Sequence, residues 1–254
     1  MNIYKIDNIS KLEQGTAVTV GMFDGVHIGH QHILNLLRHE SERLNLTPVV
    51  VTFDQHPRQV LGGGVGGVAI NQFYRVTTNE ERYSILEHFG IHHVLELHFT
   101  QEIASLSACQ FFEQILLQRL HAKALVLGYD NMFGSKGHND FDQLPSFAQS
   151  KGVSVVVDTA VQFQGIDVSS TQVRKALKQG DVELAASFMR LTPAERLEFI
   201  EAWHISQIGE GIYLRRKAIR EFILHFPERV STLSRDTFQT DPEPLWRFPL
   251  CAAG

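Results

Sequence analysis

The feature that most constrains the fold is a regular alternation of short apolar runs with longer segments of helical periodicity. The apolar runs have strand length and cover residues 16–22, 48–53, 93–98, 122–128 and 153–157. The helical segments between them are residues 30–44, 79–89, 107–120 and 141–150. The valine run at residues 49–51 is continuously apolar, which is typical of a parallel strand covered on both faces. The alternation predicts an α/β fold with a doubly wound parallel sheet, in which ligands collect at the carboxyl ends of the strands.

The pattern changes after about residue 191. Residues 193–203 and 212–226 have the spacing of amphipathic helices, and three prolines interrupt the remaining tail. We therefore expect two parts, a ligand-binding α/β domain over residues 1–191 and a helical C-terminal extension over residues 192–254, to which the sequence assigns no role.

The composition limits the cellular compartment and the classes of binding partner that the protein can have. The formal net charge of the 254 residues is −5, which argues against broad nucleic-acid binding, because phosphate backbones require a basic surface. The two cysteines, Cys109 and Cys251, lie far apart and fit a reduced, cytoplasmic protein. No segment has the pattern of a signal peptide or the length of a membrane span, so we expect no membrane association. The sequence leaves the oligomeric state open.

The segment at residues 21–30, with the sequence GMFDGVHIGH, stands between the first predicted strand and the first predicted helix. His27 and His30 are three residues apart and share one helix face. A helix N-terminus presents N–H groups and positive potential to anions, and Gly25 and Gly29 allow backbone to approach phosphate oxygens. We interpret this segment as a phosphate-binding loop, with both imidazoles donating hydrogen bonds while charge builds up in phosphoryl or nucleotidyl transfer.

Other interpretations of this histidine pair are simple packing or capping at the helix start, and metal binding. Two histidines without a nearby third ligand make a poor zinc site, and the sequence identifies no metal ligands.

A second helix start, with the sequence SSTQVR, occupies residues 169–174. Ser169 or Ser170 can cap a helix that runs to about Lys178, which Gly180 ends. Arg174 lies one turn inside, so hydroxyls, N–H groups and a guanidinium could converge on one phosphate. Ordinary capping is the alternative.

Three further segments are polar or rich in glycine. GYDNMFG at residues 128–134 and TFDQHP at residues 52–57 each follow a predicted strand, where ligand contacts and plain turns are both expected. The glycine run at residues 62–67 satisfies the spacing G-x-G-x-x-G, but no helical period follows it. It predicts a mobile surface loop, which could serve as a lid over a substrate.

The glycine run aside, the four motifs at residues 21–30, 52–57, 128–134 and 169–174 are considered in their order along the chain. In this order they resemble the adenylyltransferase (FAD synthetase) module of the bacterial bifunctional riboflavin kinase/FMN adenylyltransferase family. The similarity covers roughly residues 10–191 and carries with it the Rossmann-like nucleotidyltransferase fold. It implies ATP and FMN as substrates, FAD and pyrophosphate as products, and Mg²⁺ as cofactor, without a covalent intermediate.

The resemblance also implies roles for individual residues. His27, His30 and Arg174 would be catalytic. ATP would bind at both helix starts, on Gly21, Met22, Phe23, Asp24, Gly25, His27, His30, Ser169, Ser170, Thr171 and Arg174. FMN would bind on His56, Pro57, Asp130 and Asn131.

The chain departs from the family pattern after Asp130. Asn131 stands where an aromatic residue is usual, and the following SKGH at residues 135–138 lacks the usual arginine. A nucleotidyltransferase with another phosphate-bearing acceptor, and a silent flavin- or nucleotide-binding regulator, therefore stay open as alternatives. No motif of a riboflavin kinase module follows, so no kinase activity is expected.

Overall fold

The computed structural model describes residues 1–6, 8–9, 15–55, 75–129, 133–134, 140–179 and 181–190. The chain divides into two units, Met1–Val168 and Ser169–Gly254, and each is described by itself. No helix in the described ranges combines the length and the apolar character needed to cross a bilayer.

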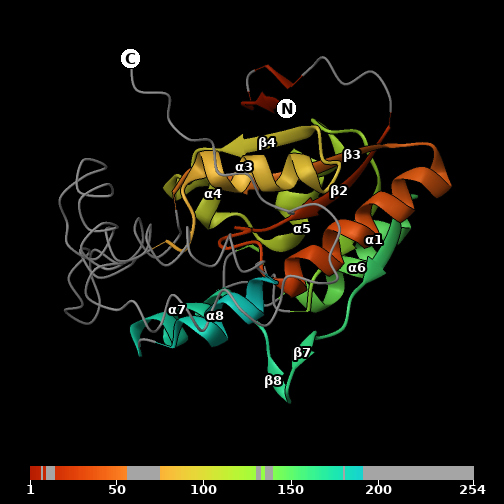
Figure 1. Ribbon diagram of the computed structural model, residues 1–254. Coiled ribbons are helices and arrows are strands. Elements are labelled where there is room, and N and C mark those ends of the chain that lie inside the picture. Colours follow the sequence, from red (N-terminus) through yellow and green to blue (C-terminus); the bar gives the residue numbers. More distant parts are fainter. Residues whose placement is uncertain are drawn as a thin grey trace, which may run out of the picture. The chain divides into compact units, whose positions relative to one another are not determined.

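The described part of the first unit contains a six-stranded sheet in the order β1-β4-β3-β2-β5-β6, with every neighbouring pair parallel (Figure 1). The strands are β1 (Asn2–Tyr4), β2 (Thr16–Val20), β3 (Thr47–Phe53), β4 (His93–Leu97), β5 (Ala122–Leu127) and β6 (Ser154–Val157). The predicted α/β class with a doubly wound parallel sheet is confirmed.

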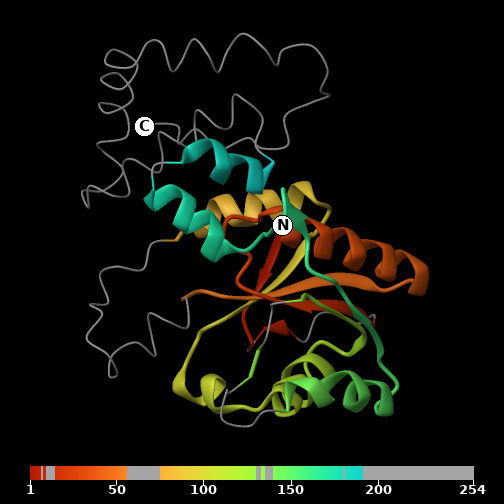
Figure 2. The same ribbon diagram turned by 90° about the horizontal axis from the view of Figure 1, so that it is seen from below.

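Helices cover both faces of this sheet. On one face lie α1 (Ile28–Leu44) and α3 (Asn79–His88), and on the other lie α5 (Ala108–Phe111), the π-helix η3 (Phe112–Leu117) and α6 (Leu144–Ser150) (Figure 2). Two short helices, α4 (Gln101–Ser105) and the 3₁₀-helix η4 (Phe141–Gln143), complete the second layer. Because side chains alternate along a strand, Val18 and Val20 of β2 join the core with Phe111 and Leu116.

The central strand β2 marks the point where the winding direction reverses. It pairs with β3 on one side and with β5 on the other, in the register Val18↔Val49 and Val18↔Leu125. In such sheets the crevice for ligands opens outside the carboxyl ends of the two strands at this switch point. The segment that follows β2 is therefore the one best placed for a ligand.

The remaining described elements are a two-stranded antiparallel hairpin and two helices. The hairpin pairs β7 (Gln162–Phe163) with β8 (Ile166–Asp167) and belongs to the first unit. The second unit begins with α7 (Ser170–Lys178), which packs against α8 (Val182–Met189).

The predicted elements and the observed ones differ mainly at their ends. All five predicted strands are present, with ends that differ by at most two residues. The helix predicted over residues 107–120 is instead α5 followed by a π-helix, whereas β1, α4, α8 and the hairpin had no sequence prediction. The helices predicted at residues 193–203 and 212–226, the boundary at residues 191/192 and the glycine run at residues 62–67 lie outside the described residues.

Candidate functional site

The loop at residues 21–27 connects β2 to α1 through an unusual backbone path. Phe23, Gly25 and Val26 all have positive φ, at 51°, 78° and 34°. The left-handed region is natural for glycine and rare for a β-branched residue such as Val26. Strained backbone of this kind persists only where its surroundings hold it, and it concentrates at binding sites.

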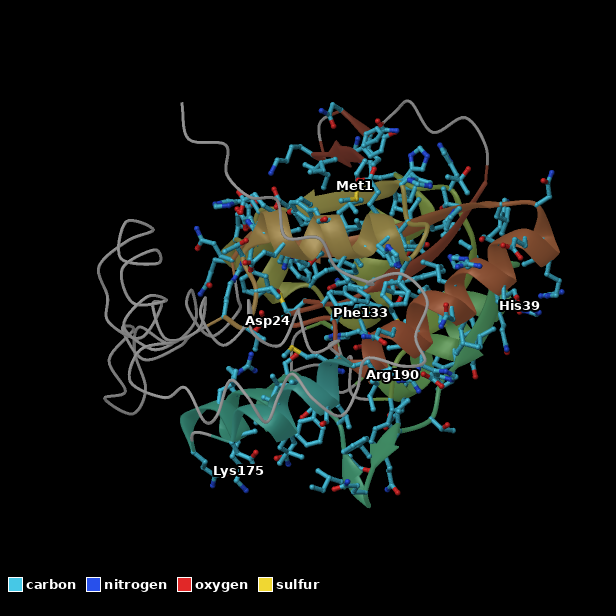
Figure 3. All side chains as sticks on the ribbon, viewed as in Figure 1. Met1, Asp24, His39, Phe133, Lys175 and Arg190 are labelled. Carbon is cyan, nitrogen blue, oxygen red and sulfur yellow. The ribbon has the colours of Figure 1, made fainter. Side chains whose placement is uncertain are left out.

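Asp24 is one of the groups that hold this loop (Figure 3). Its side chain is buried, and Oδ1 accepts hydrogen bonds from the backbone N–H groups of Val76 at 2.9 Å and Thr77 at 3.1 Å. The Gly25 N–H in turn donates to the Thr77 hydroxyl at 3.1 Å. These bonds tie the loop to the segment before α3, so Asp24 organises the loop. A direct contact between Asp24 and ATP stays a prediction.

His27 and His30 lie together at the N-terminus of α1. His27 is the N-cap residue, and its Nδ1 accepts the backbone N–H of His30 at 3.4 Å. An accepting Nδ1 leaves the proton of a neutral imidazole on Nε2, which is then the donor. The two rings are stacked with centroids 3.7 Å apart, and the buried ring of Phe23 packs on His30 at 4.9 Å.

Gly29 fits the space beside this pair. A Cβ at this position would lie 3.2 Å from Nδ1 and 3.3 Å from Cε1 of His27, tighter than ordinary contact. A side chain here would push on the His27 ring, so the glycine in H-x-G-H serves the placement of the histidine side chain. Ile28 and Gly29 begin the helix, where N–H groups have no intrahelical acceptor and suit an anion.

The second predicted phosphate site lies at the start of the second unit. Ser169 is the N-cap of α7, and its hydroxyl accepts the N–H of Gln172 at 3.3 Å. Capping by Ser169, one of the two predicted residues, is therefore confirmed. Ser170 and Arg174 are half-buried and Thr171 is exposed. That these groups bind the triphosphate stays a prediction.

The four residues predicted to contact FMN, which are His56, Pro57, Asp130 and Asn131, lie outside the described residues. Asp54, which precedes His56 and Pro57 in the TFDQHP motif, is among the described residues. Its carboxylate forms a hydrogen bond with His98 Nδ1 at 2.5 Å and accepts the Phe99 N–H at 3.2 Å. Burial alone would raise the pKa of Asp54, but the bonds from His98, Phe99 and Gln55 outweigh it and hold this pKa below its usual value.

The third motif is anchored by Phe133 and Gly134. The Phe133 ring packs on Phe111 and Phe141, and Gly134 adopts a φ of +92° against the backbone of Ala108. The glycine permits this close approach because a Cβ would lie 2.5 Å from Ala108 N. The motif is thus fastened to the N-terminus of α5.

Asp140 caps the same helix end. Its carboxylate accepts the N–H groups of Ala108 at 3.0 Å and Cys109 at 3.1 Å. Burial would raise its pKa, but the bonds from Ser107, Cys109 and Ala108 lower the pKa of Asp140 to about 2. Burial, followed by the hydrogen bond to Asp140, raises the pKa of the Cys109 thiol to about 11, so this cysteine is no thiolate nucleophile at neutral pH.

The low pKa of Asp140 predicts a pH-dependent contribution to stability. The unfolded carboxyl has a pKa of about 3.9, so as the pH falls the unfolded state binds the proton first. The stabilisation is complete above about pH 4 and is lost as the pH falls toward about 2. We expect the difference in unfolding free energy between the wild type and Asp140→Asn, measured by urea denaturation, to shrink over this window. A difference that stays constant would contradict this role.

The residues that sequence reasoning missed lie on the segment before and within α3. Arg75 and Arg82 are buried or half-buried cations that donate to backbone carbonyls at the ends of β2 and β3. A pair of arginines around a predicted helix start would ordinarily be assigned to solvent. Only the sheet order, which brings β2, β3 and β4 side by side, shows that they face strand ends.

Comparison with known proteins identifies the family of this chain. The family model for FAD synthetase matches residues 9–172. The bifunctional riboflavin kinase/FMN adenylyltransferase of Haemophilus influenzae is 33% identical over 184 residues, which cover 72% of this chain and 58% of that protein. Its counterpart from Pseudomonas fluorescens is 34% identical over 186 residues, which cover 71% and 56%. The chain thus spans somewhat more than half the length of these curated relatives.

Among solved structures, a Streptococcus pneumoniae protein described as a macrolide-efflux protein has a similar fold. The TM-score is 0.62 at 26% sequence identity, and the match covers 74% of this chain and 61% of that one. The family match extends from the residues before β2 to the first turn of α7, so it includes both helix starts. The chain belongs to the FAD synthetase family.

Proposed function

We propose that this chain is an FMN adenylyltransferase, which transfers AMP from ATP to FMN and releases pyrophosphate. The observation that carries the proposal is the stacked pair His27 and His30 at the N-terminus of α1, directly after the central strand β2. Family membership over residues 9–172 and the names of the relatives support FMN as the acceptor.

The reaction needs positioning and charge neutralisation. An oxygen of the FMN phosphate attacks the α-phosphorus of ATP in line, and the bond from that phosphorus to the pyrophosphate oxygen breaks. Negative charge grows on the α-phosphate and on the leaving pyrophosphate, where N–H donors stabilise it. The Nε2–H of His27, the imidazole of His30 and the first N–H groups of α1 supply such donors on one side.

At the start of α7, Arg174 and the hydroxyls of Ser169, Ser170 and Thr171 are the further proposed ATP-binding groups, as the family resemblance implies. A guanidinium matches phosphate geometry with two parallel donors, and a helix N-terminus adds N–H groups. His56, Pro57, Asp130 and Asn131 are the proposed contacts to FMN.

Magnesium would enter with the nucleotide. In the described ranges no group of three or more histidine, cysteine, aspartate or glutamate side chains could hold a metal ion. Mg²⁺ keeps several waters and often binds through substrate phosphates with one or two carboxylates, so here the triphosphate of ATP would be its main ligand. The small-molecule substrates and the low cysteine content fit a cytoplasmic enzyme.

The proposal is tested with the purified chain, FMN and Mg²⁺-ATP. We expect pyrophosphate and FAD to form in equal amounts. Chromatography of the flavins measures the FAD. CTP in place of ATP, and phosphopantetheine or glycerol phosphate in place of FMN, serve as controls for the two substrates. Pyrophosphate release with another acceptor but not with FMN would overturn the assignment of FMN. Binding of ATP and FMN without any turnover would identify a regulator instead.

A further inference from the structure

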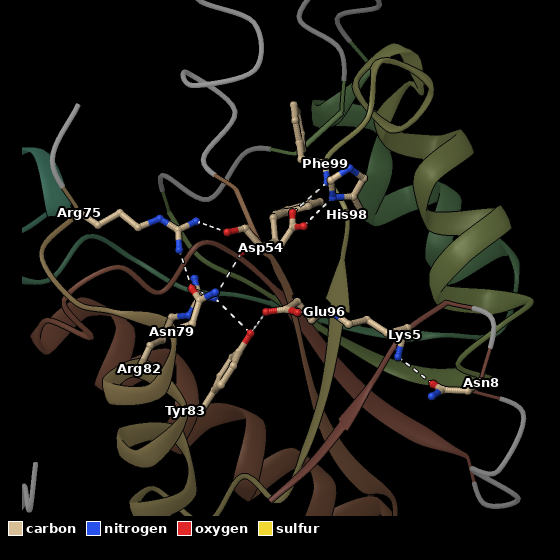
Figure 4. Close-up of polar contacts among 11 residues, drawn as sticks. Lys5, Asn8, Asp54, Arg75, Asn79, Arg82, Tyr83, Glu96, His98 and Phe99 are labelled. Carbon is tan, nitrogen blue, oxygen red and sulfur yellow. Dashed lines mark hydrogen bonds and ion pairs between the residues drawn. The ribbon is translucent and has the colours of Figure 1, made fainter. Parts of the chain in front are cut away.

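The segment at residues 75–82 contacts the ends of two neighbouring strands. Toward β2, Val76 and Thr77 hold Asp24 through their N–H groups, as described above. Toward β3, the Arg75 guanidinium donates to the carbonyl oxygen of Asp54 at 2.6 Å (Figure 4). One short segment therefore fixes both the loop at residues 21–27 and the start of the TFDQHP motif.

Arg82 makes both connections with a single side chain. Its side chain is almost completely buried, with 2% exposed. Nη1 donates to the carbonyl oxygen of Met22 at 2.9 Å, and Nη2 donates to that of Phe53 at 3.3 Å. Met22 belongs to the loop after β2 and Phe53 is the last residue of β3, so the guanidinium bridges the two strand ends.

The surroundings keep this guanidinium charged and oriented. Burial lowers the pKa of Arg82, while the nearby carboxylates of Asp24, Glu96 and Asp54 oppose that change. Arginine stays protonated at neutral pH even so. Asn79 Oδ1 accepts from Arg82 at 3.0 Å and also from Arg75 at 2.5 Å, so one amide orients both cations.

We propose that Arg82 is a positioning residue that sets the spacing between the phosphate-binding loop and the strand end that leads into the acceptor motif. The inference rests on the proposed function, because it assigns ATP to the first segment and FMN to the second. In-line transfer requires the acceptor oxygen and the α-phosphorus to meet at a defined distance. A displacement of about 1 Å in such a site costs on the order of 100-fold in rate.

The test removes the guanidinium donors while keeping an unbranched side chain. Arg82→Met removes every donor, and Arg82→Lys keeps a charge with a single donor group. Asn79→Ala is the milder variant that stays informative if Arg82→Met fails to fold, because it removes the acceptor that orients both cations. Arg43→Met is the matched control, since this exposed arginine of α1 pairs with Glu40 far along the helix from the loop.

For each variant, kcat and both KM values are measured together with hydrogen exchange at the amides of Gly25 and Val26. These amides donate to Thr77 and Phe23 and therefore report the order of the loop. We expect Arg82→Met to lower kcat by roughly 10- to 100-fold, with smaller changes in KM and faster exchange at both amides. Arg82→Lys recovers part of kcat, Asn79→Ala shifts in the same direction by less, and Arg43→Met matches the wild type.

The outcomes separate this inference from the proposed function. Unchanged kcat and unchanged exchange in folded Arg82→Met overturn the inference, even if the wild type makes FAD. A lower melting temperature with kcat per folded molecule unchanged also overturns it, because Arg82 would then act on stability alone. If the wild type makes no FAD, the proposed function fails and the exchange measurement decides the inference: faster exchange in Arg82→Met supports Arg82 as the organiser of the loop, and equal exchange rejects it.

Discussion

Replacement of His30 by alanine is expected to lower kcat for FAD formation by roughly 100- to 1000-fold, with little change in KM for ATP. The ring stacks on His27 and packs against the tilted ring of Phe23, which fixes its orientation before substrate arrives. A donor that is already oriented stabilises charge that develops only in the transition state, so its loss falls on kcat. Steady-state kinetics with ATP and FMN measure both constants.

The control for this experiment lies two residues away. His32 is half-exposed on the same helix and pairs with Asp158 at 3.2 Å, so His32→Ala removes an imidazole from α1 without touching the stacked pair. We expect this variant to keep the kcat of the wild type. His30→Asn, which retains an N–H donor, should recover part of the lost rate. A kcat for His30→Ala within a factor of two of the wild type would remove His30 from the mechanism.

The second large effect is on stability. Gly134→Ala is expected to lower the free energy of unfolding by about 2–5 kcal/mol. This loss has two parts: the cost of a left-handed backbone conformation for alanine, and the cost of placing a Cβ where there is no room. At its φ of +92°, the new Cβ would lie 2.5 Å from Ala108 N and 2.8 Å from Ala108 Cα. Both atoms are backbone atoms of α5, so no flexible side chain can move aside. Urea denaturation measures the loss.

Gly152 provides the matched control. Its φ of +78° is similar, but a Cβ there would meet nothing within 4 Å. Gly152→Ala should therefore lose only the conformational part, about 1–2 kcal/mol. Equal losses in the two variants would show that the contact with Ala108 contributes nothing.

Five of the six described strands of the sheet could be predicted from the sequence, because buried parallel strands have a clear signature. The runs that became β2, β3 and β5 are mostly apolar, and their burial follows from the covering of both faces of the sheet. β1 could not be predicted, since Asn2 and Ile3 are exposed and only pairing with β4 makes the segment a strand. Strand propensity in three residues is too weak without a neighbour.

The hairpin was overlooked although a signal was present. Gln164 and Gly165 both have positive φ, at 51° and 78°, and join β7 to β8 as a two-residue turn. Glycine in a two-residue link between Phe163 and Ile166 is the usual mark of such a turn.

At the site, only the features formed by residues close together in the sequence could be predicted. The helix start at His27 and the cap at Ser169 depend on residues within four positions of each other, and both were predicted. The bonds from Val76 and Thr77 to Asp24, and from Arg82 to Met22, join residues more than fifty positions apart. Such pairs follow from the order of the strands in the sheet, which a single sequence does not state.

The position of β1 has a consequence for synthesis of the protein. Its partner β4 lies some ninety residues later, in the register Asn2↔His93 and Tyr4↔Leu95. A ribosome that adds about 5–20 residues per second needs roughly 5 to 20 seconds to make the intervening chain. β1 therefore cannot join the growing sheet until β4 has been made, because the edge that it pairs with does not exist before then.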